Sequence, residues 1–130
     1  MLDVILRRKP TDAELAILRV LWQRGPSTVR EVHETLNQAR ATGYTTVLKL
    51  MQIMADKGLV TRDESNRAHV YAPRAAQAQT QRQLVRDLLD RAFDGSAAKL
   101  VMQALTARKT TPEEIAHIRR LLEEMEGGSR

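Results

Sequence analysis

The stretch GYTTVLKLMQIMADKGLV, residues 43–60, decides the fold because it holds a helix, its end and the start of a strand. Apolar residues recur every three or four positions in its middle, which predicts an amphipathic helix over about Tyr44–Lys57. Gly58 then provides a left-handed cap that ends the helix. From Leu59 onward the apolar period changes from 3.6 to 2, which is typical of a strand.

The first turn of this helix is chemically unusual. Tyr44, Thr45 and Thr46 stand together, although the chain contains only one Trp, two Tyr and one Phe. A pair of β-branched residues is a mediocre opening for a helix. Helix formation alone therefore does not account for the cluster, and the elements around it must supply the reason.

Two more short helices are expected before this stretch. Thr11 and Glu14, and again Thr28 and Glu31, have the spacing of a capping box. In that motif the Thr hydroxyl accepts a hydrogen bond from an unpaired backbone N–H, and the Glu reaches back to the cap. We expect these helices over about Asp12–Gln23 and Thr28–Leu36.

A β-hairpin is expected after the stretch. Period-2 patterning predicts strands at Leu59–Arg62 and Ala68–Ala72, and Asp63–Asn66 between them has the composition of a turn. Three short helices followed by a hairpin form the plan of a winged helix-turn-helix. In that plan the third helix lies in the major groove of DNA, with its first turn facing the base edges.

This plan gives the hydroxyl cluster a role. A Thr hydroxyl can bond a base edge or a phosphate, and a Tyr hydroxyl can bond a phosphate from the flank. N-capping, the alternative, explains one Thr but not the whole cluster. For Arg40, a solvated loop residue is the alternative to a phosphate clamp. The residues predicted to contact DNA are Tyr44, Thr45, Thr46, Lys49, Arg40, Arg62 and Arg67.

The distribution of charge favours an anionic partner for the first half. The net charge is +5 and the pI about 10.1. Residues 1–74 hold 12 Lys and Arg against 8 Asp and Glu, whereas residues 75–130 hold 9 against 8. A basic half of this kind indicates nucleic acid before membrane. A mildly basic surface without a nucleic-acid partner remains the alternative.

The composition also excludes several classes of protein. The chain has no Cys, hence no disulfide and no thiolate nucleophile, which fits a reducing, cytoplasmic location. No apolar run approaches the roughly 18 residues of a membrane span. The three His residues fall on different elements, and no phosphate-binding loop or Ser nucleophile motif occurs. We therefore expect no enzyme, no metal site and no cofactor.

The second half is predicted to be helical and to dimerise. A lone core of this size rarely supplies more than about 3–5 kcal/mol, yet the apolar stripes of its helices are wide. The simplest partner is a second copy, with folding back on the first half as the alternative. The residues predicted to form the dimer are Leu84, Leu88, Leu89, Ile118, Leu121, Leu122 and Met125.

The expected fold is therefore mostly α with a small β-hairpin. It combines a winged helix-turn-helix domain with an all-helical dimerisation domain. The expected boundaries are a flexible extension over 1–10, the DNA-binding domain over 11–74, the dimerisation domain over 75–126 and a disordered tail over 127–130.

Several runs of sequence resemble the penicillinase-repressor family of the BlaI/MecI type. The similarity covers about Thr11 to Glu126, and the order and spacing of its pieces are more specific than any single piece. The matching runs are Thr11-x-x-Glu14-Leu15-x-Ile17-Leu18-x-x-Leu21-Trp22, Val29-Arg30-Glu31-Val32, Tyr44-Thr45-Thr46-Val47, Lys57-Gly58-Leu59-Val60 and Asn66-Arg67-Ala68-His69-x-Tyr71-x-Pro73.

The resemblance implies a homodimeric repressor that binds a palindromic, A·T-rich operator in double-stranded DNA and controls β-lactam-resistance or related genes. In better-studied members a membrane sensor detects β-lactam and triggers proteolysis within the dimerisation domain. The scissile pair there is Asn-Phe, whereas Gln103 and Ala104 stand at the aligning positions here. Lys49 also stands where a smaller polar residue is common. The C-terminal Cys cluster of copper-sensing relatives is absent.

The main alternative is a winged helix that serves as a protein-interaction module without specific DNA binding. Such a module needs no basic face. Over residues 40–74 basic residues outnumber acidic ones six to three, which favours DNA.

Overall fold

The computed structural model describes residues 9–128, so most of the expected N-terminal extension and the last two residues lie outside the described part. The chain divides into two compact units, the first ending at Val85 and the second beginning at Arg86. The division falls later than the expected boundary at residue 74. The indole N–H of Trp22 donates to the carbonyl of Ala75 at 3.0 Å, which attaches the following segment to the first unit.

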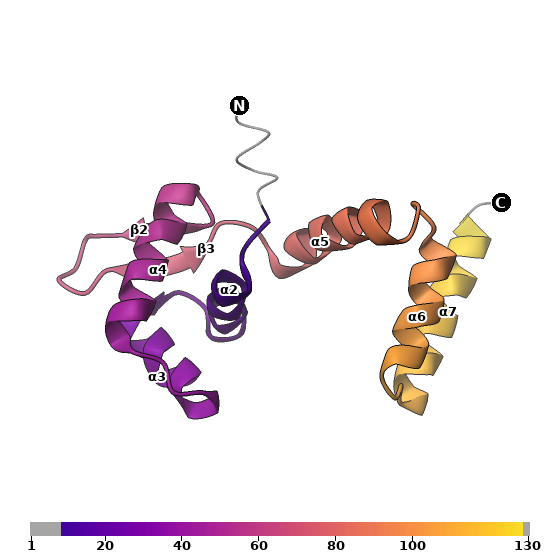
Figure 1. Ribbon diagram of the computed structural model, residues 1–130, viewed down its shortest axis with the longest axis horizontal. Helices are drawn as coiled ribbons and strands as arrows, with labels where there is room; N and C mark the ends of the chain where they lie inside the picture. Colours follow the sequence, from indigo (N-terminus) through magenta and orange to yellow (C-terminus); the bar gives the residue numbers. More distant parts are fainter. Residues whose placement is uncertain (1–8, 129–130) are drawn as a thin grey trace. The chain divides into compact units, whose positions relative to one another are not determined.

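Within its described residues, the first unit contains three helices, a small sheet and the beginning of a fourth helix (Figure 1). The second unit continues that helix and adds two more. In chain order the elements are α2 (Asp12–Arg24), β1 (Ser27–Thr28), α3 (Val29–Ala39), α4 (Tyr44–Lys57), β2 (Val60–Asp63), β3 (Val70–Pro73), α5 (Gln77–Ala92), α6 (Ala97–Ala107) and α7 (Pro112–Gly128).

The predicted capping boxes are confirmed. The Thr11 hydroxyl accepts from the Glu14 N–H, and the Glu14 carboxylate accepts from the Thr11 N–H at 2.9 Å. Thr28 caps α3 in the same way through Glu31. A third box between Thr111 and Glu114 begins α7. Each box satisfies two backbone groups that a helix start leaves unpaired, which is why these boundaries were predictable.

Helix α4 has the bounds that the sequence predicts, and it ends as expected. Gly58 adopts φ 82° and ψ 17°, the left-handed conformation that a residue without a Cβ enters at little cost. Its N–H reaches back to the carbonyls of Ala55 and Met54. The chain then turns directly into β2, so the end of α4 fixes the point at which the hairpin begins.

The sheet has one strand more than the sequence predicts. Its order is β1-β3-β2, with both neighbouring pairs antiparallel. β1 pairs Ser27 with Tyr71, and β2 pairs Arg62 with Tyr71 on the opposite side of β3. β1 is only two residues long, too short to show alternation. The turn between β2 and β3 projects beyond α4 as the wing, here defined as residues 60–73 (Figure 1).

One hydrophobic core lies within the first unit. Ile17 of α2, Val32 of α3 and Val47 of α4 are almost completely buried, as is Tyr71 of β3. The core includes a charge as well: Glu14 is 2% exposed and its carboxylate lies 2.8 Å from the Lys57 ammonium. The three helices and the sheet therefore share one packed interior, which fixes the orientation of α4.

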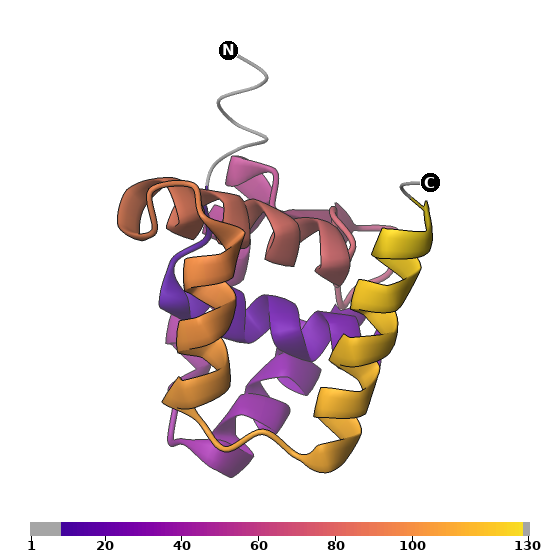
Figure 2. The same cartoon turned by 90° about the vertical axis from the view of Figure 1, so that its right-hand side faces the viewer.

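The second unit has no comparable interior. Neither α6 nor α7 has a buried residue, and the two helices run apart from one another in Figure 2. Helix α7 continues to Gly128, so its end includes Gly127 and Gly128, the first two residues of the expected tail. None of the described helices is both long and apolar enough to cross a membrane.

Candidate nucleic-acid interface

One side of α4 is packed into the core and the other side is open. Met51 and Met54 are fully buried, whereas Thr45 and Lys49 are exposed. Thr45 and Lys49 are four residues apart and therefore lie one above the other along the middle of the open side. Tyr44, which is 46% exposed, and Thr46 flank this line on opposite sides. The structure thus presents the predicted hydroxyl cluster on one convex surface.

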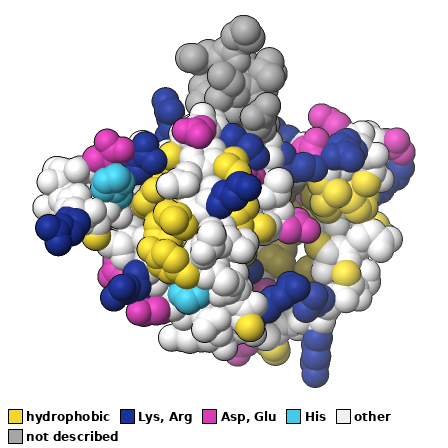
Figure 3. Space-filling model, turned by 60° about the vertical axis from the view of Figure 1, so that its left-hand side comes forward, with side chains coloured by type: hydrophobic (Ala, Val, Ile, Leu, Met, Phe, Trp, Pro, Cys, Tyr) yellow, Lys and Arg dark blue, Asp and Glu magenta, His cyan; other side chains and the backbone are white. Residues whose placement is uncertain are grey.

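A hollow separates α4 from the wing. Its volume is about 530 Å³, and it lies beside the Tyr44 flank of α4. Tyr44 and Leu48 form its helix wall, while Arg67 and His69 come from the wing. On the face shown in Figure 3, hydrophobic side chains form a central patch with charged and histidine side chains around it. Tyr44 and Arg67, predicted separately from the sequence, therefore line the same concavity.

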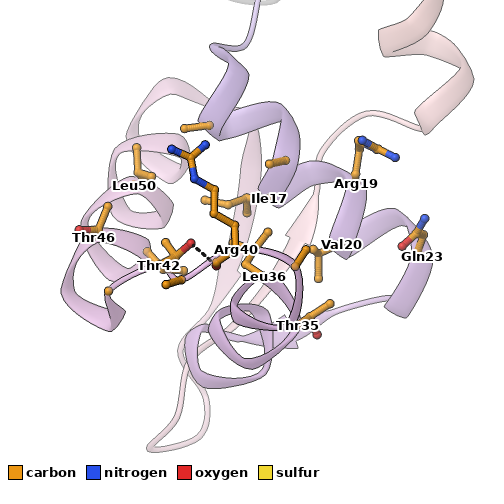
Figure 4. A pocket seen from close by; sticks show the side chains of 16 residues that line it. Ile17, Arg19, Val20, Gln23, Thr35, Leu36, Arg40, Thr42, Thr46 and Leu50 are labelled. Carbon is orange, nitrogen blue, oxygen red and sulfur yellow. Dashed lines mark hydrogen bonds between the residues drawn. The ribbon is translucent and has the colours of Figure 1, made fainter.

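A second hollow lies on the Thr46 flank, between α2, the α3–α4 turn and α4. Its volume is about 710 Å³, and no Asp or Glu lines it. In Figure 4 the side chain of Arg40 extends from the turn toward α2, while Thr46 and Leu50 lie along α4. Arg40 and Thr46 thus line the same hollow. Six of the seven residues predicted to contact DNA lie on these two flanks or on the line of Thr45 and Lys49. Arg62 is the exception.

The guanidinium of Arg62 is paired with other side chains of the wing. Its Nε lies 2.9 Å from a carboxylate oxygen of Glu64. A hydrogen bond to Tyr71, its cross-strand partner, is the largest of the causes that raise the pKa of the Arg62 guanidinium. Arg40, Lys49 and Arg67 form no ion pair with another described residue. The cations ready to meet a phosphate are therefore these three rather than Arg62.

The wing turn is held by its own acidic residue. The Asp63 carboxylate accepts hydrogen bonds from the Ser65 N–H at 2.9 Å and from the Ser65 hydroxyl at 2.6 Å. These two bonds are the main reason that the pKa of Asp63 is lowered. Asp63 therefore serves the local turn, which holds the backbone that carries Arg67.

Two residues at the entrance of α4 are missed by the sequence reasoning. His33 Nε2 lies 2.7 Å from the Thr42 carbonyl oxygen, and the Asn37 side chain accepts from the Thr42 N–H at 3.0 Å. Both residues belong to α3 and stand four positions apart. The only sequence signal for them was their four-residue spacing on the face of α3 that precedes the turn. No known motif corresponds to that spacing.

The predicted dimer residues form exposed or half-buried positions on α5 and α7. Leu121 is 50% exposed, Leu122 55% and Met125 64%. Leu88 on α5 is 45% exposed, while Leu84, Leu89 and Ile118 are half-buried. Val101 and Met102 of α6 are exposed as well and were not predicted. Gln103 and Ala104, the positions that align with the scissile pair, are exposed on α6.

No cluster of three His, Cys, Asp or Glu residues suited to a metal ion occurs within residues 9–128. The features that remain for function are therefore the open side of α4 with its two flanking hollows, and the apolar surfaces of the second unit.

Comparison with known proteins identifies a matching family and several relatives. The family described as penicillinase repressor matches residues 10–124. The transcriptional regulator BlaI from two strains of Mycobacterium tuberculosis is 37% identical over 118 residues, covering 90% of this chain and 85% of the relative. The penicillinase repressor of Bacillus licheniformis is 24% identical over 114 residues, covering 88% and 89%. A solved DNA-binding domain of the repressor BlaI superposes with a TM-score of 0.48 at 23% identity, covering 53% of this chain and 84% of that domain.

Proposed function

The chain belongs to the penicillinase repressor family, and from this premise we propose that it is a transcriptional repressor that binds a palindromic operator in double-stranded DNA as a homodimer. The relatives compared above are two transcriptional regulators and a penicillinase repressor. A repressor acts on the chromosome, so a cytoplasmic location follows from the same proposal.

The observation that carries the proposal is the open side of α4. Thr45 and Lys49 follow one line on a helix whose other side is fixed in the core. Small hydroxyls allow close approach to base edges, and a Thr methyl can touch the methyl of thymine. Arg40 and Arg67 lie on the two flanks, where the two phosphate backbones that border a major groove would run. We assign base contact to Thr45, Thr46 and Lys49 of α4, and phosphate contact to Tyr44, Arg40 and Arg67.

Dimerisation is supported by the second unit. A helical unit without buried residues, carrying leucines that are about half exposed, has little to hold it as an isolated body. A second copy would cover these apolar surfaces and place two α4 helices on one duplex. We expect half-sites about one helical turn apart, near 34 Å, or a multiple of that distance.

Relief of repression by proteolysis is the finer part of the proposal. We propose cleavage within the second unit, triggered indirectly by a membrane sensor of β-lactam, with β-lactam-resistance or related genes as targets. Gln103 and Ala104 are exposed but helical, so α6 would have to open locally before a protease could bind its backbone. These residues also differ from the Asn-Phe pair, so the cleaved bond is to be located by mass spectrometry.

Selection of bound duplexes from a random DNA pool tests the proposal directly. The purified full chain is expected to enrich an inverted repeat with a fixed spacing between its halves. With about six phosphate contacts, the logarithm of affinity plotted against the logarithm of salt concentration should slope near −5. Recovery of unselected sequence at every salt concentration would remove the repressor proposal.

One observation favours a second function, a protein-interaction module. Apolar side chains, those of Leu48 and Ala68 among them, contribute to the lining of the hollow beside the wing. An apolar groove of this kind fits a protein side chain as well as a sugar–phosphate backbone. The two functions differ in salt dependence, because neutralising phosphates releases condensed counterions and makes DNA affinity fall steeply with salt, whereas insertion of an apolar side chain does not.

A further inference from the structure

We propose that His33 and Asn37 are positioning residues, which hold the turn before α4 from the side of α3 and so leave the first turn of α4 open for DNA. The proposal rests on the proposed function and concerns the orientation of α4 toward DNA. It adds two residues of α3 to the interface, neither of which belongs to the predicted contacts.

The geometry centres on Thr42. The Asn37 side-chain oxygen accepts from the Thr42 N–H at 3.0 Å, and His33 Nε2 lies 2.7 Å from the Thr42 carbonyl oxygen. Residues four apart on a helix point to the same side. Both backbone polar groups of this one residue are therefore bound by one face of α3. Thr42 directly precedes Gly43, the N-cap of α4, so its position determines where α4 begins.

Helix α4 begins differently from α2, α3 and α6. Thr11, Thr28 and Ser96 each accept a backbone N–H through a side-chain oxygen, whereas Gly43 has no side chain with which to do so. The first hydrogen bond of α4 runs from the Val47 N–H to the Gly43 carbonyl. The earlier N–H groups have no partner within the helix, and such groups favour a phosphate oxygen.

An ordinary cap would conflict with this use. A Thr or Ser at position 43 would place its own oxygen on the N–H groups that face the ligand. The pair on α3 avoids the conflict, because it fixes the turn through Thr42 and places no oxygen on the N–H groups of the first turn of α4. The turn is held and the helix start stays accessible, which is the arrangement that a pre-organised DNA contact needs.

His33 has a second contact that points to the same role. Its ring meets the ring of Tyr44 edge to face, with centroids 5.6 Å apart and an angle of 82° between the planes. Tyr44 is exposed on the wing flank of α4 and is a predicted phosphate contact. His33 thus fixes the turn with its Nε2 and supports Tyr44 with its ring.

The hydrogen bond also fixes the chemistry of the ring. A carbonyl oxygen only accepts, so Nε2 of His33 must carry a proton. The neutral tautomer with its proton on Nε2 and the imidazolium both meet that requirement. Substitution of the side chain therefore tests the hold on Thr42 by removing this donor.

Two substitutions of His33 separate its contacts. His33→Phe keeps a ring for Tyr44 but removes the donor to Thr42, whereas His33→Gln keeps an N–H donor and removes the ring. Asn37→Ala removes the acceptor for the Thr42 N–H. Gln38→Ala is the matched control, because Gln38 is an exposed residue of the same helix whose side chain forms no hydrogen bond with another described residue.

Each full-chain variant is measured in two ways. Amide hydrogen exchange without DNA reports whether the Thr42 N–H has lost its partner. Titration with the duplex selected by the wild type, and with a scrambled duplex, reports specific and non-specific affinity. We expect Asn37→Ala to speed exchange at Thr42. We expect Asn37→Ala and His33→Phe each to weaken specific binding about tenfold, while non-specific binding changes less than about threefold. This difference is expected because a misoriented α4 loses base contacts before it loses phosphate contacts.

The outcomes distinguish this proposal from the proposed function. His33→Gln should regain most of the specific affinity that His33→Phe loses, and Gln38→Ala should match the wild type. Faster exchange at Thr42 with unchanged specific affinity would overturn the positioning role and leave the repressor proposal intact. Equal losses of specific and non-specific affinity would also overturn it, since they would show general damage. A wild type that selects no duplex would remove both.

Discussion

At the scale of single residues, Glu14 joins the beginning of α2 to the end of α4. Its carboxylate accepts the Thr11 N–H in the capping box and also binds the Lys57 ammonium at 2.8 Å. A buried carboxylate without partners would be costly, and here backbone and ammonium both satisfy it. One side chain therefore serves as a local cap and as a tertiary contact that holds α4 in register.

The pKa of Glu14 makes this contact dependent on pH. Burial by itself raises that pKa, but the hydrogen bonds from Lys57 and Thr11 and the charge of Lys57 outweigh burial, so the pKa lies below its ordinary value of 4.5. A carboxylate whose pKa is lower in the folded state contributes stability above its unfolded pKa. That contribution is lost as the pH falls through the folded pKa.

We therefore predict that Glu14→Gln lowers the free energy of unfolding by about 2 kcal/mol at pH 7, since a hydrogen bond to a charged group is lost. The difference from the wild type should shrink as the pH falls below about 4.5. Urea unfolding at a series of pH values measures it, with the exposed Glu34→Gln as control. A difference that stays constant down to pH 3 would show that the carboxylate charge is irrelevant.

A second prediction at this scale concerns Thr46. Thr46→Ala should lower specific DNA affinity about fivefold to tenfold, because one hydrogen bond and one methyl contact are removed. Non-specific affinity should change little, since no cation is lost. Titration of selected and scrambled duplexes measures both. If neither affinity changes, the assignment of α4 as the recognition helix is wrong.

At the scale of elements, the sequence is most informative where the controlling chemistry is local. The capping boxes of α2 and α3, the glycine cap of α4 and the bounds of α4 were all predictable from neighbouring residues. β1 was not, because two residues form a strand only through their pairing with β3. The contacts of His33 and Asn37 were not predictable either, since they depend on the conformation of the turn between α3 and α4.

The same distinction between local and long-range contacts applies to the candidate site. The open side of α4 could be predicted from helical periodicity, because burial of one face leaves the other exposed. The separation of Arg62 from the other cations could not, since it depends on Glu64 and on the cross-strand position of Tyr71. Sequence spacing places residues along an element, whereas pairing across the sheet decides which of them remain available.

This difference within the wing yields a prediction. Arg67→Ala should weaken specific and non-specific DNA binding alike, and it should reduce the steepness of the salt dependence by about one unit, as expected for one lost phosphate contact. Arg62→Ala is the matched comparison, because it removes the same charge from a residue already paired with Glu64. Equal effects of the two substitutions would contradict the distinction drawn between them.

At the scale of the whole molecule, the two units differ in how they are stabilised. The first has a packed core around Ile17, Val32 and Val47, whereas helices α6 and α7 of the second have no buried residue. A protein surface seldom leaves this much leucine and methionine exposed without a partner. The proposed association of two copies through the second unit would explain the exposure, and it would bring two copies of α4 to one operator.

Disruption of that association gives a prediction at the same scale. Leu121→Asp, at a position that is 50% exposed, should cost little in a single chain but should place a charge within the proposed apolar dimer surface. The variant should sediment as a monomer and bind the selected duplex at least about tenfold more weakly, because the two half-sites are no longer linked. Glu124→Gln, on the same helix, should leave both properties unchanged. A Leu121→Asp variant that remains dimeric would show that the dimer interface does not include Leu121.

The most direct test is the mass of the complex between the full chain and the selected duplex, measured by sedimentation equilibrium at micromolar concentration. We predict two chains on each duplex, together with a dimer in the absence of DNA. A single chain per duplex, with a monomer in its absence, would contradict the claim that paired second units deliver two α4 helices to one operator.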